Sequence, residues 1–349
     1  MVMAVLAGAG VAHPAPVTQV ALWEGYFGRR YTGVQRALAD RIFRNAGVST
    51  RHGAVSPLVE DVSGWSTATR MGRYLTEALP LGKAAVADAL AAAGLDPGGV
   101  GLFAVCSCTG YATPGLDILL ARDLGLAADT QRLFVGHMGC YAALPGLGVA
   151  ADYVRARGRA AVLLCLELTS LHVQPPSRDA QQMVAHALFS DAAAAVVVLP
   201  SGVSGVGGYQ VVEVVSVTDV VTADYMTWEV TDLGFRMGLS PRVPEVLAAH
   251  VGVLVGDLLG RHGLAVAEVG GWAVHPGGPR ILDVVQERLG LPAGALAASR
   301  AVLDRHGNCS SPTVLMIVEE LRAARPEHVV ALAFGPGLTL YAVLLRALS

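Results

Sequence analysis

The sequence predicts an α/β protein made by duplication, with layered αβαβα halves related by a pseudo-twofold axis. The first observation is a set of continuous apolar runs, such as AAVLLCLEL (160–168) and VVALAF (329–334), which are typical of buried strands. The second is that these runs alternate with helical stretches, a pattern that favours a parallel-rich sheet covered on both faces. The third is an internal repeat.

The repeat consists of two matches at one offset. Residues 94–105 (GLDPGGVGLFAV) align with residues 263–274 (GLAVAEVGGWAV), 169 positions later. At the same offset, the turn at 137–140 (HMGC) aligns with the turn at 306–309 (HGNC). Each turn is followed by a helical stretch and then by a buried strand. Two matches in one register indicate a duplicated chain.

The boundary between the halves is expected in the Pro/Ser/Gly-rich stretch 200–208. This divides the chain into an N-terminal half (1–205) and a C-terminal half (206–349). The segment 222–245 interrupts the alternation of helices and strands, so we expect an insertion that forms a wall of a site. Ligands of layered α/β proteins bind at the carboxyl ends of strands.

Composition narrows the function classes. Hydrophobic residues make up 53% of the 349 residues and charged residues 15%, which permits a large core. A net charge of -3 argues against a nucleic-acid-binding face, and no apolar run reaches the ~18 residues of a membrane span. Five cysteines without a framework pattern, and an apolar N-terminus without a positive n-region, predict a reduced, cytoplasmic protein. Neither metal-ligand spacing nor a GxGxxG dinucleotide fingerprint is present.

Three residues are candidates for chemistry. Cys140 follows a glycine and begins a helical stretch, where the helix dipole favours the thiolate, although free cysteines are commonly buried hydrophobes. His275 ends a predicted strand, where a structural histidine is equally common. Asn308 precedes a helix, where asparagine is also a common N-cap. The repeat makes the two related turns face one another, so that cysteine, histidine and amide can form a nucleophile, a base and an oxyanion donor. We therefore expect a lowered pKa for Cys140, supported by His275.

Four sequence blocks carry a family resemblance: GHMGCYAALPGL, AVHPGGPRILD, HGNCSSPTVLMIVEEL and AFGPGLTL. They resemble the signature blocks of type III polyketide synthases, the chalcone synthase-like enzymes of the thiolase superfamily, in the family's order. LFSDAAAAVVV (188–198) is similar to a further block, and MTWEVTDLGFRMGLSPRVP (226–244) resembles a block of bacterial members. The similarity extends from about Arg41 to the C-terminus. It implies a thiolase-like fold.

The resemblance implies a role for each matching position. Cys140 corresponds to the acyl carrier, and His275 and Asn308 to the groups that stabilise its thiolate and the enolate oxygen. Phe189 and Met237 occupy the two gatekeeper positions, although many members have phenylalanine at the second. The positions that line the substrate cavity are Cys108, Thr109, Thr113, Glu167, Thr169, His172 and Ser310. The positions expected to contact coenzyme A are Arg41, Gly277, Gly278 and Arg280.

The implied reaction begins with loading of an acyl group from acyl-CoA onto Cys140. Decarboxylative Claisen condensation with malonyl-CoA then extends the chain, and the product cyclises. The resemblance implies no metal or redox cofactor, because coenzyme A thioesters are substrates. It also implies a homodimer in which Thr113 reaches the neighbouring subunit. An acyl carrier protein is an alternative donor.

Three other functions compete with this interpretation. A ketoacyl-synthase III-like enzyme would perform one condensation or acyl transfer. A non-catalytic thiolase-fold partner subunit would not need the intact cysteine, histidine and asparagine. A cysteine hydrolase would not require the duplication.

Several positions depart from the family pattern. Ser190 and Ala192 replace glycines, which predicts a stiffer loop around Phe189. The remaining departures are Met237, Tyr341 in place of a glutamate, and Leu38 and Asn45 where lysines often bind coenzyme A phosphates. They leave the starter, the chain length and the product open.

Overall fold

Strands and helices alternate along most of the chain. The computed structural model describes residues 2–202 and 207–348. The strands are β1 (Ala4–Ala12), β2 (Pro16–Thr18), β3 (Thr50–His52), β4 (Val100–Cys106), β5 (Gln131–Val135), β6 (Ala160–Glu167), β7 (Ala192–Pro200), β8 (Tyr209–Thr218), β9 (Met226–Thr231), β10 (Gly234–Leu239), β11 (Gly271–Val274), β12 (His328–Gly335) and β13 (Thr339–Ala347). The helices are α1 (Gln19–Gly25), α2 (Gly33–Arg44), α3 (Thr67–Ala93), α4 (Leu116–Leu124), α5 (Ala143–Arg157), α6 (Ala180–Leu188), α7 (Val243–Arg261), α8 (Pro279–Arg288), α9 (Ala297–His306) and α10 (Pro312–Arg322).

The main sheet confirms the duplication. Its strand order is β11-β12-β13-β8-β1-β7-β6-β4-β5. Read outward from the centre, β1-β7-β6-β4 and β8-β13-β12-β11 have the same directions: two antiparallel pairs followed by a parallel one. The halves meet where β1 pairs with β8 in antiparallel orientation. The expected boundary between 205 and 206 falls in residues 203–206, outside the described part of the chain.

The directions of the strands correct one expectation. Antiparallel pairs outnumber parallel ones in this sheet, so the predicted parallel-rich sheet is wrong. The apolar runs arise because both faces of the strands are covered. On β6, Leu163 and Cys165 pack in the cluster that contains α5, whereas Val162 and Leu164 pack in the cluster that contains α3. Burial on both faces gives a continuous apolar run in either strand direction.

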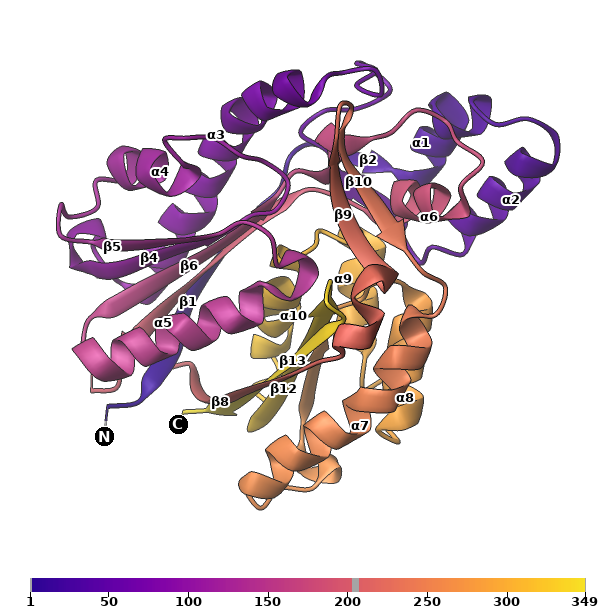
Figure 1. Cartoon of the computed structure of the whole chain (residues 1–349). Coiled ribbons are helices and arrows are strands. Elements are labelled where there is room, and N and C mark those ends of the chain that lie inside the picture. The colour runs from indigo at the N-terminus through magenta and orange to yellow at the C-terminus, as the bar shows by residue number, and fades with distance from the viewer. Residues whose placement is uncertain (1, 203–206, 349) are drawn as a thin grey trace.

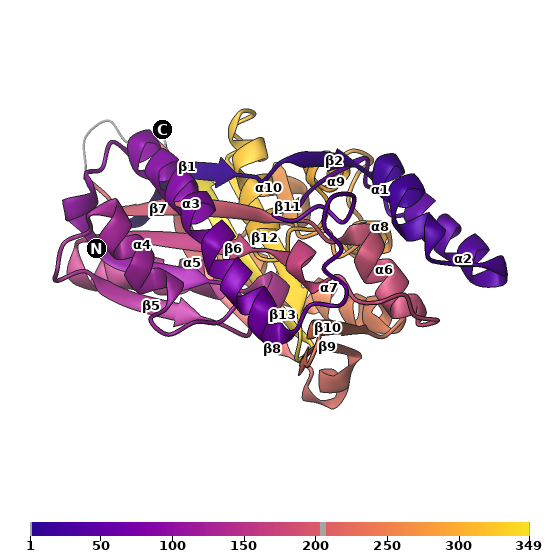
Figure 2. The ribbon, with the colours of Figure 1, turned by 90° about the horizontal axis from the view of Figure 1, so that it is seen from above.

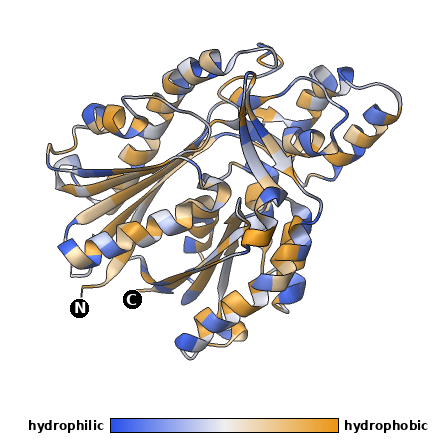
Figure 3. Ribbon diagram, in the orientation of Figure 1, coloured by the Kyte–Doolittle hydropathy of each residue, from blue (hydrophilic) through white to orange (hydrophobic). Residues whose placement is uncertain are grey.

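The layers follow from these contacts. Helices α5 and α10 share one core with strands of both halves. Helices α3 and α4 cover the outer face of the N-terminal half, and α7 and α8 that of the C-terminal half (Figure 1). The strands between them are largely hydrophobic (Figure 3). Helices α1 and α2 project beyond the sheet at one end (Figure 2). The layered fold predicted from the sequence is confirmed.

The segment 222–245 forms the wall predicted for it. It contains β9 and β10, which pair as an antiparallel hairpin, and leads into α7. Helix α7 is the one described helix that is long and apolar enough to cross a membrane by length and composition. Its residues Val251, Val255 and Leu258 are buried in the core shared with α8 and β11–β13. This is the apolar stripe expected of a helix that covers a sheet.

Glycines in β1 allow α3 to lie directly on the strand. A Cβ atom at Gly10 would lie 2.2 Å from the Ala85 carbonyl oxygen and 2.6 Å from the Ala89 nitrogen. A Cβ at Gly8 would lie 2.5 Å from the Ala89 oxygen. These neighbours are helix backbone atoms, which cannot move singly. The contact between α3 and β1 therefore requires glycine at both positions.

We expect Gly10→Val to destabilise the protein by at least about 2 kcal/mol, because overpacking forces α3 off the sheet. The free energy of unfolding, measured by urea denaturation, tests this. Gly98→Ala is the control, since no atom lies within 4 Å of the added Cβ; it should change stability by no more than about 0.5 kcal/mol. Equal effects of the two substitutions would contradict the close approach.

Candidate active site

The three candidate chemical residues line one cavity. A cavity of about 590 Å³ is bordered by Cys140 from the N-terminal half and by His275 and Asn308 from the C-terminal half. Its other walls come from α2, α6 and the segment that follows β10. Six further predicted positions line it or adjoin its mouth: Phe189, Met237, Gly277, Gly278, Arg280 and, among the departures, Asn45. The repeat-based expectation that the two turns face a common space is confirmed.

Cys140 lies in a short 3-10 turn, Gly139–Tyr141, and α5 begins three residues after it at Ala143. Gly139 has a φ of +71°, a conformation that favours glycine. The Gly335 backbone lies close by, since a Cβ there would be 3.6 Å from the Cys140 nitrogen and 2.8 Å from the Tyr141 ring. The end of β12 thus packs against the cysteine turn. These close contacts fix the position of the Cys140 thiol, which is 7% exposed.

Burial determines the charge state of the site. Burial raises the pKa of Cys140 to about 11. A hydrogen bond with Ser310 acts in the opposite direction but is the smaller effect. Burial lowers the pKa of His275 to about 3, and neither ring nitrogen of His275 has a hydrogen-bond partner among the described residues. The direction of the Cys140 shift is opposite to the lowered pKa expected for Cys140 from the sequence. Both groups are neutral at pH 7 because desolvation outweighs the favourable position before α5.

Asn308 combines the two roles that sequence left open. Its side-chain oxygen accepts a hydrogen bond from the Ser310 N–H at 2.9 Å, an Asx-type turn before α10. Ser310 has a φ of +58°, a strained conformation for a residue other than glycine. The side-chain NH₂ group of Asn308 has no hydrogen-bond partner in the described part of the chain. The oxygen therefore holds the turn, and the NH₂ group is available as a donor in the cavity.

The loop that carries Phe189 is tied to Asn308. The Asn308 N–H donates to the Leu188 carbonyl at 2.8 Å, and the Ser190 N–H donates to the Asn308 carbonyl at 3.0 Å. Buried Arg51, which sequence analysis did not identify, donates to the Phe189 carbonyl at 3.1 Å. Burial lowers the pKa of Arg51 to about 9, so the guanidinium remains charged at pH 7. No motif marks Arg51, because its partners are backbone carbonyls.

Ser190, one of the two substituted glycine positions, is part of the same anchor together with Asp191. The Ser190 hydroxyl accepts a hydrogen bond from the His52 N–H at 2.8 Å. Asp191 accepts hydrogen bonds from the backbone N–H groups of Ala54 and Ser170, both at 2.8 Å. These contacts support the expectation of a stiff loop around Phe189.

Family comparisons agree with this geometry. Residues 5–201 match the N-terminal domain of the chalcone and stilbene synthases, and residues 214–349 match the C-terminal domain. The chain belongs to the chalcone and stilbene synthase family, the type III polyketide synthases. It is a polyketide synthase, an acyl-transferring condensing enzyme with a thiolase-like fold, as the sequence predicted.

Relatives and solved structures are similar over nearly the whole chain. The 1,3,6,8-tetrahydroxynaphthalene synthase of Streptomyces peucetius subsp. caesius is 37% identical over 321 residues, covering 90% of this chain and 85% of that protein. Pks18 of Mycobacterium tuberculosis, described as an alpha-pyrone synthesis polyketide synthase-like protein, is 32% identical over 332 residues, covering 89% and 82%. The crystal structure of PKS-I from the brown alga Ectocarpus siliculosus superposes with a TM-score of 0.93 at 28% identity, covering 100% and 99% of the two chains.

Phe189 and Met237 stand at the junction of three cavities of the polyketide synthase. Both line the 590 Å³ cavity and two smaller cavities of about 60 and 20 Å³. The 20 Å³ pocket continues from Cys140 and is lined by four predicted positions: Cys108, Thr109, Thr169 and Ser310. Both gatekeeper positions therefore separate the large cavity from the interior.

Trp228 fills the interior space, and sequence analysis missed it. It lines the 20 Å³ and 60 Å³ pockets, and its indole N–H donates to the Cys108 carbonyl at 2.9 Å. Its ring lies edge-on to His172 and Phe235. His172, which lines the 60 Å³ pocket, donates from Nε2 to the Thr109 carbonyl at 2.7 Å and accepts at Nδ1 from the Phe235 N–H at 2.9 Å. Burial lowers the pKa of His172 to about 4, so it is a neutral, fixed wall.

Three predicted positions lie outside the described cavities. Glu167 is buried behind the inner pocket, where the Cys108 N–H and the Thr109 hydroxyl donate to it at 3.0 and 2.7 Å. These hydrogen bonds hold its carboxyl group among Cys108, Thr109 and Ser311, and burial raises its pKa to about 7. Thr113 is exposed on the surface of its own chain. Arg41 is exposed on α2, where its neighbour Ile42 lines the cavity.

Trp228→Ala should enlarge the inner pocket and shift the products towards longer polyketides, because bulk beside Cys108 limits the growing chain. Mass spectrometry of the products from malonyl-CoA and one acyl-CoA measures this. Trp228→Phe is the matched control: it loses the hydrogen bond to Cys108 but keeps an aromatic ring. An unchanged product distribution in Trp228→Ala, with normal turnover, would show that Trp228 does not limit chain length.

Proposed function

We propose that this polyketide synthase transfers an acyl group from acyl-CoA to Cys140 and extends it with malonyl-CoA before cyclisation. The observation that carries the proposal is the single cavity that joins Cys140, His275 and Asn308. Roles for these three residues follow from their protonation states and hydrogen bonds. Substrates, subunit assembly and location are argued from the residues around them.

Loading starts from two neutral groups. The Cys140 sulfur attacks the carbonyl carbon of the acyl-CoA thioester while His275 accepts the thiol proton. The bond from that carbon to the coenzyme A sulfur then breaks, and His275 returns the proton to the leaving thiolate. Neutral His275 is the form that can accept a proton, and both of its ring nitrogens are unpartnered within the described residues. The acyl group remains on Cys140 as a thioester.

Extension needs oxyanion donors. When malonyl-CoA loses carbon dioxide, negative charge develops on its thioester oxygen. We assign the hydrogen bonds to that oxygen to the Asn308 NH₂ group and a protonated nitrogen of His275, because both residues line the cavity. The enolate carbon attacks the Cys140 thioester, a carbon–carbon bond forms, and the Cys140 sulfur leaves with the electron pair. The product is a β-ketoacyl-CoA, which transfers its acyl group back to Cys140 with release of coenzyme A. Repeated loading and extension give the poly-β-keto chain that cyclises.

The large cavity suits a coenzyme A arm. Ile42, Val184 and Leu188 give it apolar walls, and Gly277 and Gly278 allow close approach to the backbone. Arg280 lines the cavity and exposed Arg41 lies nearby on α2, which gives two positive groups for phosphates. An acyl carrier protein is the alternative donor of the first acyl group, because its phosphopantetheine arm has the same chemistry.

A homodimer and a cytoplasmic location complete the proposal. Thr113 is exposed in a surface loop, a position from which it can reach a second subunit. All five cysteines are free thiols, which suits a reducing compartment. Sedimentation velocity of the purified protein tests the dimer.

Product analysis tests the reaction. The enzyme is incubated with malonyl-CoA and a series of acyl-CoA starters, and products are identified by mass spectrometry. Products with two or more added ketide units support repeated extension. A single β-ketoacyl product from every starter would instead favour a ketoacyl-synthase III-like reaction.

Cys140→Ala should abolish acyl loading, because the nucleophile is lost. Cys309→Ala should retain it, since the Cys309 thiol is fully buried and lies on none of the described cavities. Cys108→Ala should also retain it, as Cys108 lies beyond Cys140 in the inner pocket. Intact-protein mass spectrometry after incubation with acyl-CoA measures the adduct. An adduct that persists on Cys140→Ala would remove the basis of the proposal.

His275→Ala should make acyl loading strongly dependent on pH. Without the base, the thiol must ionise unaided, and burial raises the pKa of Cys140 to about 11. The thiolate fraction, and with it the loading rate, should then rise about tenfold per pH unit between pH 7 and 9. The wild type should show a weaker dependence because His275 takes the proton. Rate measurements by rapid quench decide this; parallel pH profiles would contradict the role of His275.

Asn308 variants separate the donor from the turn. Asn308→Asp keeps an oxygen for the Ser310 N–H but replaces the NH₂ group, whereas Asn308→Ala loses both. Both variants should lower the rate of malonyl-CoA decarboxylation by on the order of 10²–10³-fold. Only Asn308→Ala should also lose stability, by about 1 kcal/mol. Released carbon dioxide and thermal unfolding are the measurements. Normal decarboxylation in Asn308→Asp would assign Asn308 to the turn alone.

A further inference from the structure

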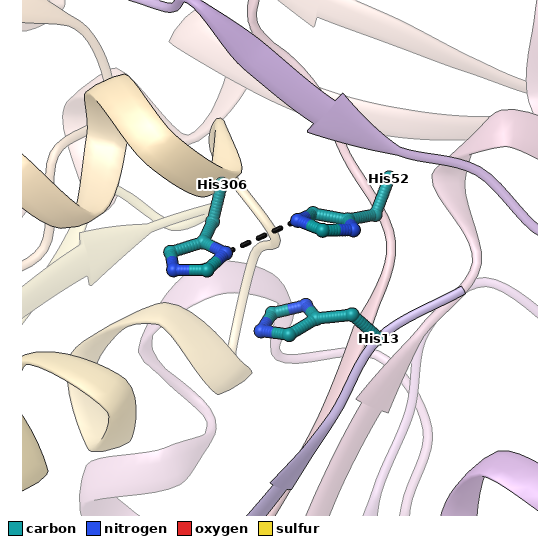
Figure 4. Close-up of side chains that lie close together, drawn as sticks. All are labelled: His13, His52 and His306. Atoms are coloured by element: carbon teal, nitrogen blue, oxygen red, sulfur yellow. Dashed lines mark hydrogen bonds between the residues drawn. The ribbon is translucent and has the colours of Figure 1, made fainter. Parts of the chain in front are cut away.

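Three histidines far apart in sequence meet outside the catalytic cavity. His13 follows β1, His52 ends β3, and His306 is the last residue of α9. One ring nitrogen from each lies within 4.8 Å of the other two. Figure 4 shows the three rings gathered between the N-terminal segments and the end of α9. None of the three lines the 590 Å³ cavity, and all are half-buried.

The hydrogen bonds of His52 direct a lone pair into this cluster. Its Nδ1 lies 3.0 Å from the Pro14 carbonyl oxygen, which can only accept, so Nδ1 carries the proton. Nε2 of the neutral ring is then an acceptor, and it faces Nδ1 of His306 at 3.1 Å. A histidine that donates its other N–H to a backbone carbonyl has the arrangement usual for a metal ligand.

The separations are close to those of a zinc centre. With zinc–nitrogen bonds of about 2.0–2.1 Å, two nitrogens at tetrahedral angles lie roughly 3.3–3.4 Å apart. The 3.1 Å between His52 and His306 is near this value. His13 stacks on both rings, with centroids 4.3 and 4.5 Å away, so it must rotate to aim a nitrogen at the same point. Its Nδ1 is buried without a hydrogen-bond partner among the described residues, and the rotation can present this nitrogen to the ion.

We propose that His13, His52 and His306 bind one divalent transition-metal ion, with Zn²⁺ as the occupant. Three imidazoles without a carboxylate or thiolate suit Zn²⁺ far better than Mg²⁺ or Ca²⁺. Water supplies the fourth ligand from the open side. On binding, the Nδ1 lone pair of His306 replaces its N–H, and that ring takes the Nε2–H tautomer.

The ion would join the two halves beside the active site. His13 and His52 belong to the N-terminal half, while His306 lies two residues before Asn308. His52 is also hydrogen-bonded through its backbone to Ser190, next to Phe189. A bound ion would therefore hold the Asn308 turn and the Phe189 loop from behind. Its role is structural, because none of the three histidines lines the catalytic cavity.

Zinc binding to the full chain tests the proposal. Protein freed of metal with a chelator is titrated with Zn²⁺ against a chromogenic competitor. We expect one Zn²⁺ per chain, and an affinity lower on the order of 100-fold or more in His52→Gln or His306→Gln. His137→Gln is the matched control, because His137 is the repeat-related partner of His306 and is exposed. Cys140→Ser controls for binding to the catalytic thiol. Both controls should bind Zn²⁺ as the wild type does.

Two further measurements keep the result independent of variant folding. Co²⁺ bound to the wild type should show visible bands of nitrogen and oxygen coordination and no thiolate charge-transfer band. Zn²⁺ should also raise the melting temperature of the wild type and of His137→Gln, but not that of His306→Gln. Absence of stoichiometric binding by the wild type would overturn the proposal. So would a thiolate band with Co²⁺, or equal loss of binding in His137→Gln or Cys140→Ser.

Discussion

The backbone bridge between Asn308 and the segment Leu188–Ser190 is the interaction on which the active site depends. Two hydrogen bonds, at 2.8 and 3.0 Å, join a turn of the C-terminal half to a loop of the N-terminal half. Through them Asn308 and Phe189 keep one spacing. Gly307 makes the approach possible, because a Cβ there would lie 2.9 Å from Ser190 and 3.0 Å from the Leu188 oxygen. Arg51 and Asp191 reinforce the same loop from the side away from the cavity.

Deep burial of the site disfavours charged forms of Cys140 and His275 but strengthens the hydrogen bonds made there. Removing water leaves Cys140 and His275 neutral in the free enzyme, since neither charge is solvated. The same low dielectric strengthens hydrogen bonds to a developing oxyanion. Charge therefore appears in this site only when substrate is present to receive it. Within the described residues His275 has no hydrogen-bond partner and the Asn308 NH₂ group makes no hydrogen bond, which leaves both available to such an oxyanion.

The volume of the pocket beyond Cys140 is limited by the size of one side chain, that of Trp228. Trp228 from the β9–β10 hairpin occupies it, and the hydrogen bond to the Cys108 carbonyl fixes the ring. His172 and Phe235 stack behind it. Cys140 and Asn308 lie in turns related by the repeat, whereas Trp228 lies in the β9–β10 hairpin between β8 and α7. The residues proposed for the reaction and the residue that limits the inner pocket thus lie in different parts of the chain.

The sequence by itself determined the duplicated fold, the family and the three residues that meet in the cavity, because each leaves a local or periodic signal. The constant offset of the repeat indicates the pseudo-twofold axis. The short blocks around Cys140, His275 and Asn308 predict tight turns. Strand direction was missed, since a strand covered on both faces reads the same in either direction. Only the tertiary structure decided the deep burial of Cys140, the hydrogen bonds that hold Glu167 and the anchoring by Arg51. It alone brought together Trp228 with Cys108, and His13 with His52 and His306. These depend on burial depth and on contacts between distant segments, which no spacing in the chain encodes.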